Sequence, residues 1–392
     1  MRPQEIKVGL SIAISAGETS GDLNGAHLIE ELKKLRGDLH IWGAGGSAMR
    51  EAGAEIVVDM AGGGTIGIAE TLKSLPGVAV KYHQLRRELL RRRPDVFVPI
   101  DFGAFNIRLA QIAYKNGIPV VYYFPPSSWR RCPKNASKLL ACGGKVITPF
   151  PWSAEFLASQ GVDARFVGHP LIDIVKPSME KSAFLCELGL SDSLPTIGLL
   201  PGSRSHEIRE HLMPMIDCAQ IMHRELGGAQ FVIGAANRSA QMREKIAEVS
   251  RGKESFPEIR VVERRTYDCM AASDLLIATS GTATLEAAIM GIPMMIIYCG
   301  SAIMRFEFLF RKSILENYIG MPNIVADRGV CPELINEDVT PEKLADIALS
   351  LFGNEDRISK MKSELSDVKN KIGSPGAAGR AARAVLEMGC LE

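Results

Sequence analysis

Two glycine-containing loops in the second half of the sequence have the composition of phosphate-binding loops. The first follows the apolar run 196–200 and contains Gly202, Ser203 and Arg204 before a predicted helix. Backbone N–H groups at a helix N-terminus bind anions, glycine lets a phosphate come close, and arginine adds charge-assisted hydrogen bonds. This loop predicts a diphosphate site, and the alternative is an ordinary turn with a surface arginine.

The second loop follows the apolar run 275–278 and contains Ser280, Gly281 and Thr282, whose amides and hydroxyls could bind a phosphate. Glu286 follows about one helical turn later, where its carboxylate could accept hydrogen bonds from two ribose hydroxyls. The alternative for Glu286 is a favourable interaction with the dipole of its own helix. Because both loops occur in one half of the chain, each favours the interpretation of the other as part of a nucleotide site.

The loop after the first apolar run, 8–16, is rich in acids and hydroxyls. It contains Glu18, Ser20 and Asp22 and lacks the GxGxxG pattern of dinucleotide-binding loops. Since carboxylates repel a pyrophosphate, sugar hydroxyls are the better ligand for this loop. The alternative is that Ser20 and Asp22 cap the helix that follows.

Asp101 follows the apolar run 96–100, at the carboxyl end of a predicted parallel strand. Its carboxylate could be a general base that removes a proton from an acceptor hydroxyl, or it could be a turn residue. His169 lies near the expected domain junction and could bind phosphate, relay a proton or be structural. The other histidines and the eight cysteines have no metal-ligand spacing, so we expect no metal and no cofactor.

These loops need strands and helices that bring them together. Apolar runs predict strands at 8–16, 40–43, 55–59, 96–100, 120–124 and 145–148, and then at 196–200, 230–234, 259–262, 275–278 and 293–298. Their alternation with helices is typical of an α/β protein with two Rossmann-like doubly wound domains facing a cleft. We expect an N-terminal domain over 1–173, a C-terminal domain over 174–355, and helices over 356–392 that pack back on the N-terminal domain.

The overall composition excludes several classes of protein. The 392 residues contain 46 Lys and Arg against 45 Asp and Glu, a balance that argues against a nucleic-acid binder. No apolar stretch reaches the roughly 18 residues that span a bilayer. Scattered cysteines indicate free thiols, so we expect a cytoplasmic protein.

One segment departs from this balance. Leu85, Leu89 and Leu90 fall on one face of a predicted helix whose other faces carry five arginines, namely Arg86, Arg87, Arg91, Arg92 and Arg93. A basic amphipathic helix can lie on anionic lipid, and the alternative is a solvated helix face.

Taken in order, the motifs make the chain similar to the lipid-A-disaccharide synthase family of inverting GT-B glycosyltransferases. The matching segments are SAGETSGD at 15–22, IGIAETL at 66–72, PDVFVPID at 94–101, FN at 105–106, FVGHPLID at 166–173, LLPGSR at 199–204, SGTATLE at 280–286 and MPN at 321–323. The resemblance covers nearly the whole chain and implies a UDP-sugar held mainly by the C-terminal domain.

The resemblance implies transfer from UDP-2,3-diacylglucosamine to 2,3-diacylglucosamine 1-phosphate, which gives a β-1,6-linked disaccharide and UDP in lipid A biosynthesis. It implies that Asp101 is the general base. The implied UDP contacts are Gly202, Ser203, Arg204, Ser280, Gly281, Thr282 and Glu286. The implied substrate contacts are Glu18, Ser20, Asp22, Asn106, Trp129, His169, Glu207 and Asn323. A peripheral position at the inner face of the cytoplasmic membrane and a homodimer follow from the same resemblance.

The chain departs from the family pattern on the acceptor side. Ala104 stands where the family usually has an aspartate, and Pro125 and Arg131 replace a serine and a tryptophan. A diverged GT-B transferase or UDP-sugar epimerase with a different acceptor therefore stays open as an alternative. A second alternative is a non-catalytic nucleotide-sugar or membrane-surface binding module, which requires Asp101 to be only a turn residue.

Overall fold

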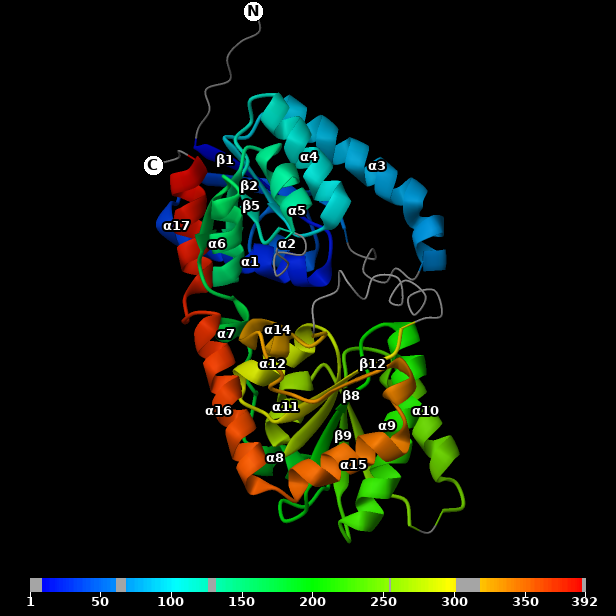
Figure 1. Ribbon diagram of the computed structural model, residues 1–392. Coiled ribbons are helices and arrows are strands. Elements are labelled where there is room, and N and C mark those ends of the chain that lie inside the picture. Colours follow the sequence, from blue (N-terminus) through cyan, green and yellow to red (C-terminus); the bar gives the residue numbers. More distant parts are fainter. Residues whose placement is uncertain (1–8, 61–67, 126–131, 254, 301–317, 390–392) are drawn as a thin grey trace, which may run out of the picture. The chain divides into compact units, whose positions relative to one another are not determined.

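The computed structural model describes residues 9–60, 68–125, 132–253, 255–300 and 318–389, except the side chains of 19 and 68–76. The chain forms two compact units, one of Met1–Asp173 with Ile372–Glu392 and one of Ile174–Lys371 (Figure 1). Each unit contains a parallel β-sheet with flanking helices. The predicted α/β class with two Rossmann-like doubly wound domains is confirmed.

The sheet of the first unit has the strand order β3-β2-β1-β4-β5-β6-β7. Its strands are β1 (Leu10–Ala16), β2 (Leu39–Gly45), β3 (Glu55–Asp59), β4 (Val96–Ile100), β5 (Tyr122–Tyr123), β6 (Lys145–Thr148) and β7 (Asp163–Phe166). Its helices are α1 (Thr19–Leu35), α2 (Ser47–Glu51), α3 (Ile68–Arg92), α4 (Gly103–Lys115), α5 (Pro133–Leu140), α6 (Pro151–Ser159) and α17 (Ala377–Gly389), with α7 (Leu171–Ile174) at the boundary.

Both faces of the first sheet are covered by apolar side chains. Ile12 of β1 belongs to a buried cluster that also contains Leu28 of α1 and Val385 of α17. The next residue, Ala13, belongs to the cluster on the other face, together with Leu85 of α3. Because neither face is open to water, β1 is a continuous apolar run in the sequence rather than an alternating one.

The sheet of the second unit has the strand order β10-β9-β8-β11-β12-β13. Its strands are β8 (Thr196–Leu200), β9 (Gln230–Ala235), β10 (Glu258–Glu263), β11 (Leu275–Thr279), β12 (Met294–Tyr298) and β13 (Glu333–Ile335). Its helices are α8 (Lys181–Glu187), α9 (Ser205–Glu225), α10 (Ser239–Ser250), α11 (Thr266–Ala272), α12 (Thr282–Ile289), α14 (Met321–Ala326), α15 (Pro341–Phe352) and α16 (Glu355–Lys371), with the 3-10 helix η1 (Asn336–Asp338).

The two sheets share the same central arrangement. In the first unit β2 and β4 lie on opposite sides of β1, and in the second unit β9 and β11 lie on opposite sides of β8. The strand order reverses at these points, and open α/β sheets bind their ligands at the carboxyl ends of the strands there. The loops after β1, β4, β8 and β11 are therefore where a site is expected.

The C-terminal helices divide differently from the expected boundary at residue 356. Helix α16 belongs to the second unit, and only the chain from Ile372 onward belongs to the first. Met361, Leu365 and Val368 form a buried stripe on α16, and the backbone N–H of Met294 in β12 points to the Met361 sulfur. The buried stripe of α16 thus packs within the second unit, and the chain enters the first unit only after this helix.

Two short strands, β7 and β13, were not predicted. Their residues are half-exposed or exposed, so neither strand has an apolar run or a clear alternation. No helix within the described ranges is long and apolar enough to cross a bilayer.

Candidate functional site

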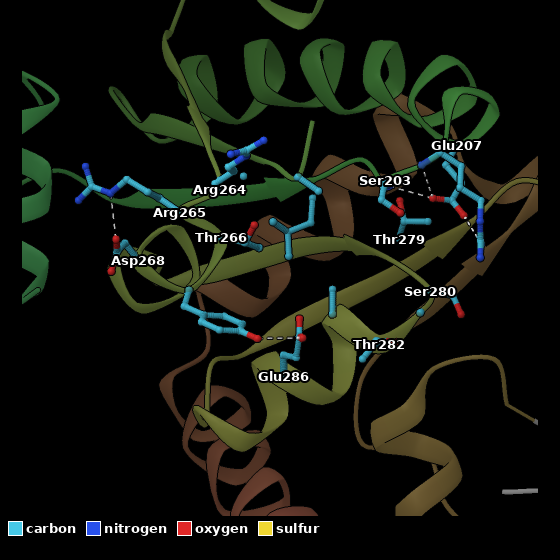
Figure 2. Close-up of a pocket in the computed structure, with 18 of the residues that line it drawn as sticks. Ser203, Glu207, Arg264, Arg265, Thr266, Asp268, Thr279, Ser280, Thr282 and Glu286 are labelled. Atoms are coloured by element: carbon cyan, nitrogen blue, oxygen red, sulfur yellow. Dashed lines mark hydrogen bonds and ion pairs between the residues drawn. The ribbon is translucent and has the colours of Figure 1, made fainter. Parts of the chain in front are cut away.

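A pocket of about 660 Å³ lies at the carboxyl ends of the strands of the second unit. Both glycine-containing loops, the segment after β10 and the start of α12 line it (Figure 2). The lining includes Gly202, Ser203, Arg204, Glu207, Ser280, Gly281, Thr282 and Glu286. The structure thus brings together all residues that the sequence suggested for UDP binding, together with Glu207.

The loop after β8 is held by an internal carboxylate. Oε2 of Glu207 accepts hydrogen bonds from the backbone N–H of Ser203 at 2.9 Å and of Arg204 at 3.1 Å. Gly202 has φ +107°, and a Cβ there would lie 2.5 Å from the same oxygen, so this turn requires glycine. The amides that were expected to be free for phosphate are therefore already bonded, and Glu207 shapes the loop.

Arg204 remains available as a charged side chain. Its Nη1 donates to Oε1 of Glu207 at 2.9 Å, while 56% of the arginine side chain stays exposed. The guanidinium has five N–H donors, so this ion pair leaves several of them free for a bound anion. The loop after β8 can consequently bind an anion through the Arg204 side chain rather than through its backbone N–H groups.

The loop after β11 has the opposite arrangement. Among the described residues, the backbone N–H groups of Gly281, Thr282 and Ala283 have no hydrogen-bond partner. Nothing lies within 4 Å of the position that a Cβ of Gly281 would take, so a ligand can approach the backbone there. These open amides at the N-terminus of α12 have the geometry that suits an anion.

Ser280 takes a different role from the expected one. Its hydroxyl donates to the carbonyl of Ile319 at 2.7 Å, and its backbone N–H donates to Ile297 at 2.9 Å. Both donors are therefore occupied, and Ser280 anchors the loop. The neighbouring Thr279 was not predicted, although the residue lines the pocket, and its hydroxyl is buried without a partner among the described residues.

Glu286 is half-buried at the base of the same pocket. The Tyr267 hydroxyl donates to its Oε1 at 3.1 Å, and burial raises the pKa of the Glu286 carboxyl. Tyr267 and Arg264 were also missed by the sequence interpretation. Both follow β10, a third strand of the same sheet, so the rule that ligand residues follow parallel strands could have found them.

In the first unit, Asp101 is held in a constrained loop after β4. Asp101 has φ +43° and Phe102 has φ +55°, a left-handed conformation that costs about 1–3 kcal/mol for each non-glycine residue. The Tyr122 hydroxyl and the Asn106 amide donate to the Asp101 carbonyl at 2.9 and 3.2 Å. These two hydrogen bonds hold the strained turn in place.

The surroundings of Asp101 disfavour its negative charge. Desolvation by the protein raises the pKa of the carboxyl to about 6, and the negative charge of Glu18 adds to the rise. The carboxylate nevertheless stays accessible to a ligand. An accessible carboxylate with a pKa near neutrality is suited to accept a proton from a substrate hydroxyl.

Of the acidic loop after β1, Glu18 and Ser20 are exposed, and Asp22 is not free. The Asp22 carboxylate accepts hydrogen bonds from the backbone N–H groups of Gly46, Ala48 and Met49, at 2.6 to 3.3 Å. Asp22 thus caps α2, which is neither the substrate contact nor the cap of its own helix that the sequence suggested.

Asn106 and Asn323 are structural residues rather than substrate contacts, because both side chains are 0% exposed. Oδ1 of Asn106 accepts from the Ser15 hydroxyl, and its Nδ2 donates to carbonyls that include those of Ser15 and Ile100. Asn323 ties the 330–333 segment to α14 through both of its polar atoms. Each amide fixes a loop at a strand end.

His169 is half-buried between the rings of Phe124 and Phe150. Burial lowers its pKa to about 4, and its Nδ1 accepts the backbone N–H of Leu171 at 3.2 Å. His169 is therefore neutral at pH 7 and brings no positive charge to a phosphate. Trp129 lies outside the described residues.

The arginine run ends α3, but its leucine face is not available to lipid. Leu85 and Leu89 are 0% and 2% exposed and pack in the core of the first unit. Arg92 pairs with Glu55 and lies 4.8 Å from the centre of the Trp42 ring. Leu85 and Leu89 therefore cannot insert into a bilayer as part of the apolar face that the sequence suggested, and Leu90 is half-buried.

The other arginines of the run differ in how exposed they are. Arg91 pairs with Glu88, and Arg93 donates to the carbonyl of Asn116. Arg86 and Arg87 are both exposed and without a hydrogen bond among the described residues, although Arg87 lies 3.8 Å from Glu88.

Solved structures share the arrangement of two Rossmann-like domains. The chain is similar to the UDP-GlcNAc 2-epimerase from Neisseria meningitidis bound to UDP-GlcNAc, with a TM-score of 0.62 and 14% identity, covering 97% of this chain and 98% of the epimerase. It is also similar to MurG from Acinetobacter baumannii, with a TM-score of 0.58 and 14% identity, covering 96% and 99% of the two chains. The fold is that of the GT-B class of α/β enzymes.

Sequence comparison narrows this class. Residues 12–385 match the model of the family described as lipid-A-disaccharide synthetase. The chain is 35% identical over 380 residues to the lipid-A-disaccharide synthase of Syntrophus aciditrophicus, which covers 96% of this chain and 97% of that protein. The chain belongs to the lipid-A-disaccharide synthetase family, and the resemblance seen in its motifs is confirmed.

Proposed function

We propose that this protein transfers 2,3-diacylglucosamine from its UDP derivative to 2,3-diacylglucosamine 1-phosphate and so makes the lipid A disaccharide. The observation that carries this proposal is the family match over residues 12–385. The fold alone is shared with epimerases, so it does not choose between the two reactions. The family match favours the synthase over a diverged epimerase.

The donor diphosphate is proposed to bind at the loop after β11. The unpartnered amides of Gly281, Thr282 and Ala283 offer N–H donors, and the exposed Arg204 guanidinium adds positive charge from the loop after β8. The Glu286 carboxylate at the base of the pocket accepts ribose hydroxyls, with Tyr267 fixing its orientation. Charge that develops on the leaving UDP is stabilised by donors that are already in place.

Asp101 is the proposed general base. Its carboxylate takes the proton of the acceptor 6-hydroxyl, the hydroxyl oxygen bonds to the anomeric carbon of the donor, and the bond from that carbon to the diphosphate breaks to release UDP. Attack opposite the leaving group inverts the anomeric carbon, which gives the β linkage. The residues used here need no cofactor.

The membrane contact of this reaction is proposed to be electrostatic. Both substrates carry acyl chains, and Arg86 and Arg87 form an exposed cationic patch on α3 while Leu85 and Leu89 stay in the core. Anionic headgroups attract such residues by about 1 kcal/mol each near a membrane surface.

The test of the proposed function is a reconstituted assay. The protein, both acylated substrates and detergent micelles are mixed, and the disaccharide and released UDP are measured by mass spectrometry. We expect both products in equal amounts. Folded protein that binds UDP but forms no disaccharide would overturn the proposal.

A further inference from the structure

A second cavity of the first unit carries polar groups that the proposed reaction has not used. It has a volume of about 370 Å³ and lies between α4 and α5, which are labelled in Figure 1. Its lining comprises Gly103, Ala104, Ile107, Arg108, Gln111, Pro125, Asn135, Lys138 and Leu139. Its first lining residue in the sequence, Gly103, follows Asp101 by two positions.

Each helix gives this cavity one cation and one amide. Arg108 and Gln111 are three residues apart on α4, and Asn135 and Lys138 are three residues apart on α5, so each pair lies on one helix face. None of these four side chains has a hydrogen bond or ion pair with any residue in the described ranges. Their donors are open to a ligand.

The charge of the cavity is strongly one-sided. Among the described residues, two cations line it and no carboxylate does, although the chain as a whole has nearly equal numbers of acids and bases. Ala104 contributes a methyl group where the family usually has an aspartate, which makes this wall more favourable for an anion. Buried Leu139 and half-buried Ile107 close the apolar side of the cavity.

We propose that this cavity binds the phosphate monoester of the acceptor sugar through Arg108 and Lys138, with Gln111 and Asn135 as further donors. The proposal rests on the proposed function. A phosphate monoester carries between one and two negative charges at pH 7 and several acceptor oxygens, which match two cations and two amides. The cavity distinguishes a phosphorylated acceptor from the same sugar without its phosphate.

The position of the cavity favours the acceptor, rather than the donor, as the substrate whose phosphate it binds. The donor diphosphate has its own open amides in the second unit, whereas this cavity adjoins the loop of the general base. In a hexose 1-phosphate, C1 and C5 flank the ring oxygen; C1 carries the phosphate, and C5 carries the hydroxymethyl group that ends in the 6-hydroxyl. A phosphate held beside residues 103–104 thus keeps the reacting hydroxyl within one sugar ring of its anchor.

The test compares two acceptors, 2,3-diacylglucosamine 1-phosphate and 2,3-diacylglucosamine, in micelles of a neutral detergent. The variant Arg108→Gln/Lys138→Gln removes both cations, and Lys134→Gln is the matched control because Lys134 is exposed on α5 and does not line the cavity. We expect the double variant to raise KM for the phosphorylated acceptor by about 100-fold, since each lost charge-assisted contact weakens binding roughly ten-fold or more. We expect kcat, KM for the donor and KM for the unphosphorylated acceptor to stay within about two-fold.

Three results would overturn the proposal. They are an unchanged KM for the phosphorylated acceptor, an equal rise for both acceptors, and a defect seen only when anionic phospholipid is added to the micelles. The last result would assign the two cations to bilayer headgroups.

A failure of the proposed function gives a different pattern. Wild-type protein would then form no disaccharide from either acceptor, and the cavity is tested with glucosamine 1-phosphate followed by NMR titration. Weaker binding to the double variant than to Lys134→Gln supports the anion site, and equal binding overturns it.

Discussion

The two units use the same pair of strand-end loops in matching ways. The loop after each central strand, β1 or β8, is followed by a helix whose first turns carry a carboxylate that binds backbone amides, Asp22 in one unit and Glu207 in the other. The loop after the neighbouring strand, β4 or β11, leads to a carboxylate with a raised pKa, Asp101 or Glu286.

This comparison separates two uses of acidic residues at the same sheet edge. A carboxylate that accepts hydrogen bonds from two or three backbone N–H groups holds a loop in place, and its oxygens are then less available to a ligand. A carboxylate with a raised pKa and an open face is unstable as an ion and is available to a ligand. The chemistry is therefore expected at the loops after β4 and β11, with the other two loops as supports.

The largest effect is expected from removing the open carboxylate of the first unit. Asp101→Asn should lower turnover by about 10²–10⁴-fold, because general-base catalysis contributes that much. Asp163→Asn, an exposed carboxylate on β7, is the control and should retain full turnover. Retention of most activity by Asp101→Asn would show that this loop is only structural.

The pH dependence sharpens the same point. Turnover of the wild type should fall as the pH drops through about 6, where the Asp101 carboxyl takes up its proton. Glu18→Gln removes a negative neighbour and should move this acid limb to lower pH.

The same carboxyl should affect stability. Because the pKa of Asp101 is raised on folding, its ionised form destabilises the fold at pH 8, so Asp101→Asn should raise Tm there. This gain in Tm should disappear as the pH falls from 6 to 4.

The next effect concerns the open loop of the second unit. Gly281→Val places a branched side chain over the unpartnered amides and strains a backbone with φ +157°, so UDP affinity should fall about 100-fold by calorimetry. Gly291→Ala is the matched control, because Gly291 also has positive φ and open space but does not line this pocket. Equal losses in both variants would trace the effect to strain.

A supporting carboxylate should affect stability more than chemistry. Glu207→Ala leaves the Ser203 and Arg204 amides without their partner and should lower the free energy of unfolding by about 1–3 kcal/mol. Glu210→Ala, which removes only a surface ion pair on the same helix, should change it by less than about 0.5 kcal/mol. Urea denaturation measures the free energy of unfolding of both variants. Equal losses in Glu207→Ala and Glu210→Ala would contradict the role of Glu207 as the carboxylate that supports its loop.

The smallest effect is expected at the membrane patch. Arg86→Gln/Arg87→Gln should weaken binding to anionic vesicles by about ten-fold at low salt, and the difference should shrink at high salt. Binding that is insensitive to salt in a vesicle sedimentation assay would contradict an electrostatic contact.

Strands and loops were predictable from the sequence because their signals are local. The runs 55–59, 96–100, 145–148 and 196–200 match β3, β4, β6 and β8 residue for residue. The partners of polar side chains were not predictable, because they depend on register and on which amides face which carboxylate. Asn106 and Asn323 thus matched functional motifs, yet their side-chain amides donate hydrogen bonds to backbone carbonyls that lie 5 to 91 residues away in the sequence.

The same limit explains the arginine run and the last helices. A helical pattern shows that Leu85 and Leu89 share a face, but it does not show whether protein or lipid covers that face. Similarly, the stripe on α16 predicts a buried face without stating which sheet buries it.

The most direct test of the central claim is the NMR spectrum of the disaccharide formed by the wild-type protein from the two acylated substrates. The account predicts a single new glycosidic bond, β-configured and joined to the 6-position of the acceptor, with one UDP released per bond. An α linkage, a different position, or an epimerised UDP-sugar in place of a disaccharide would contradict it.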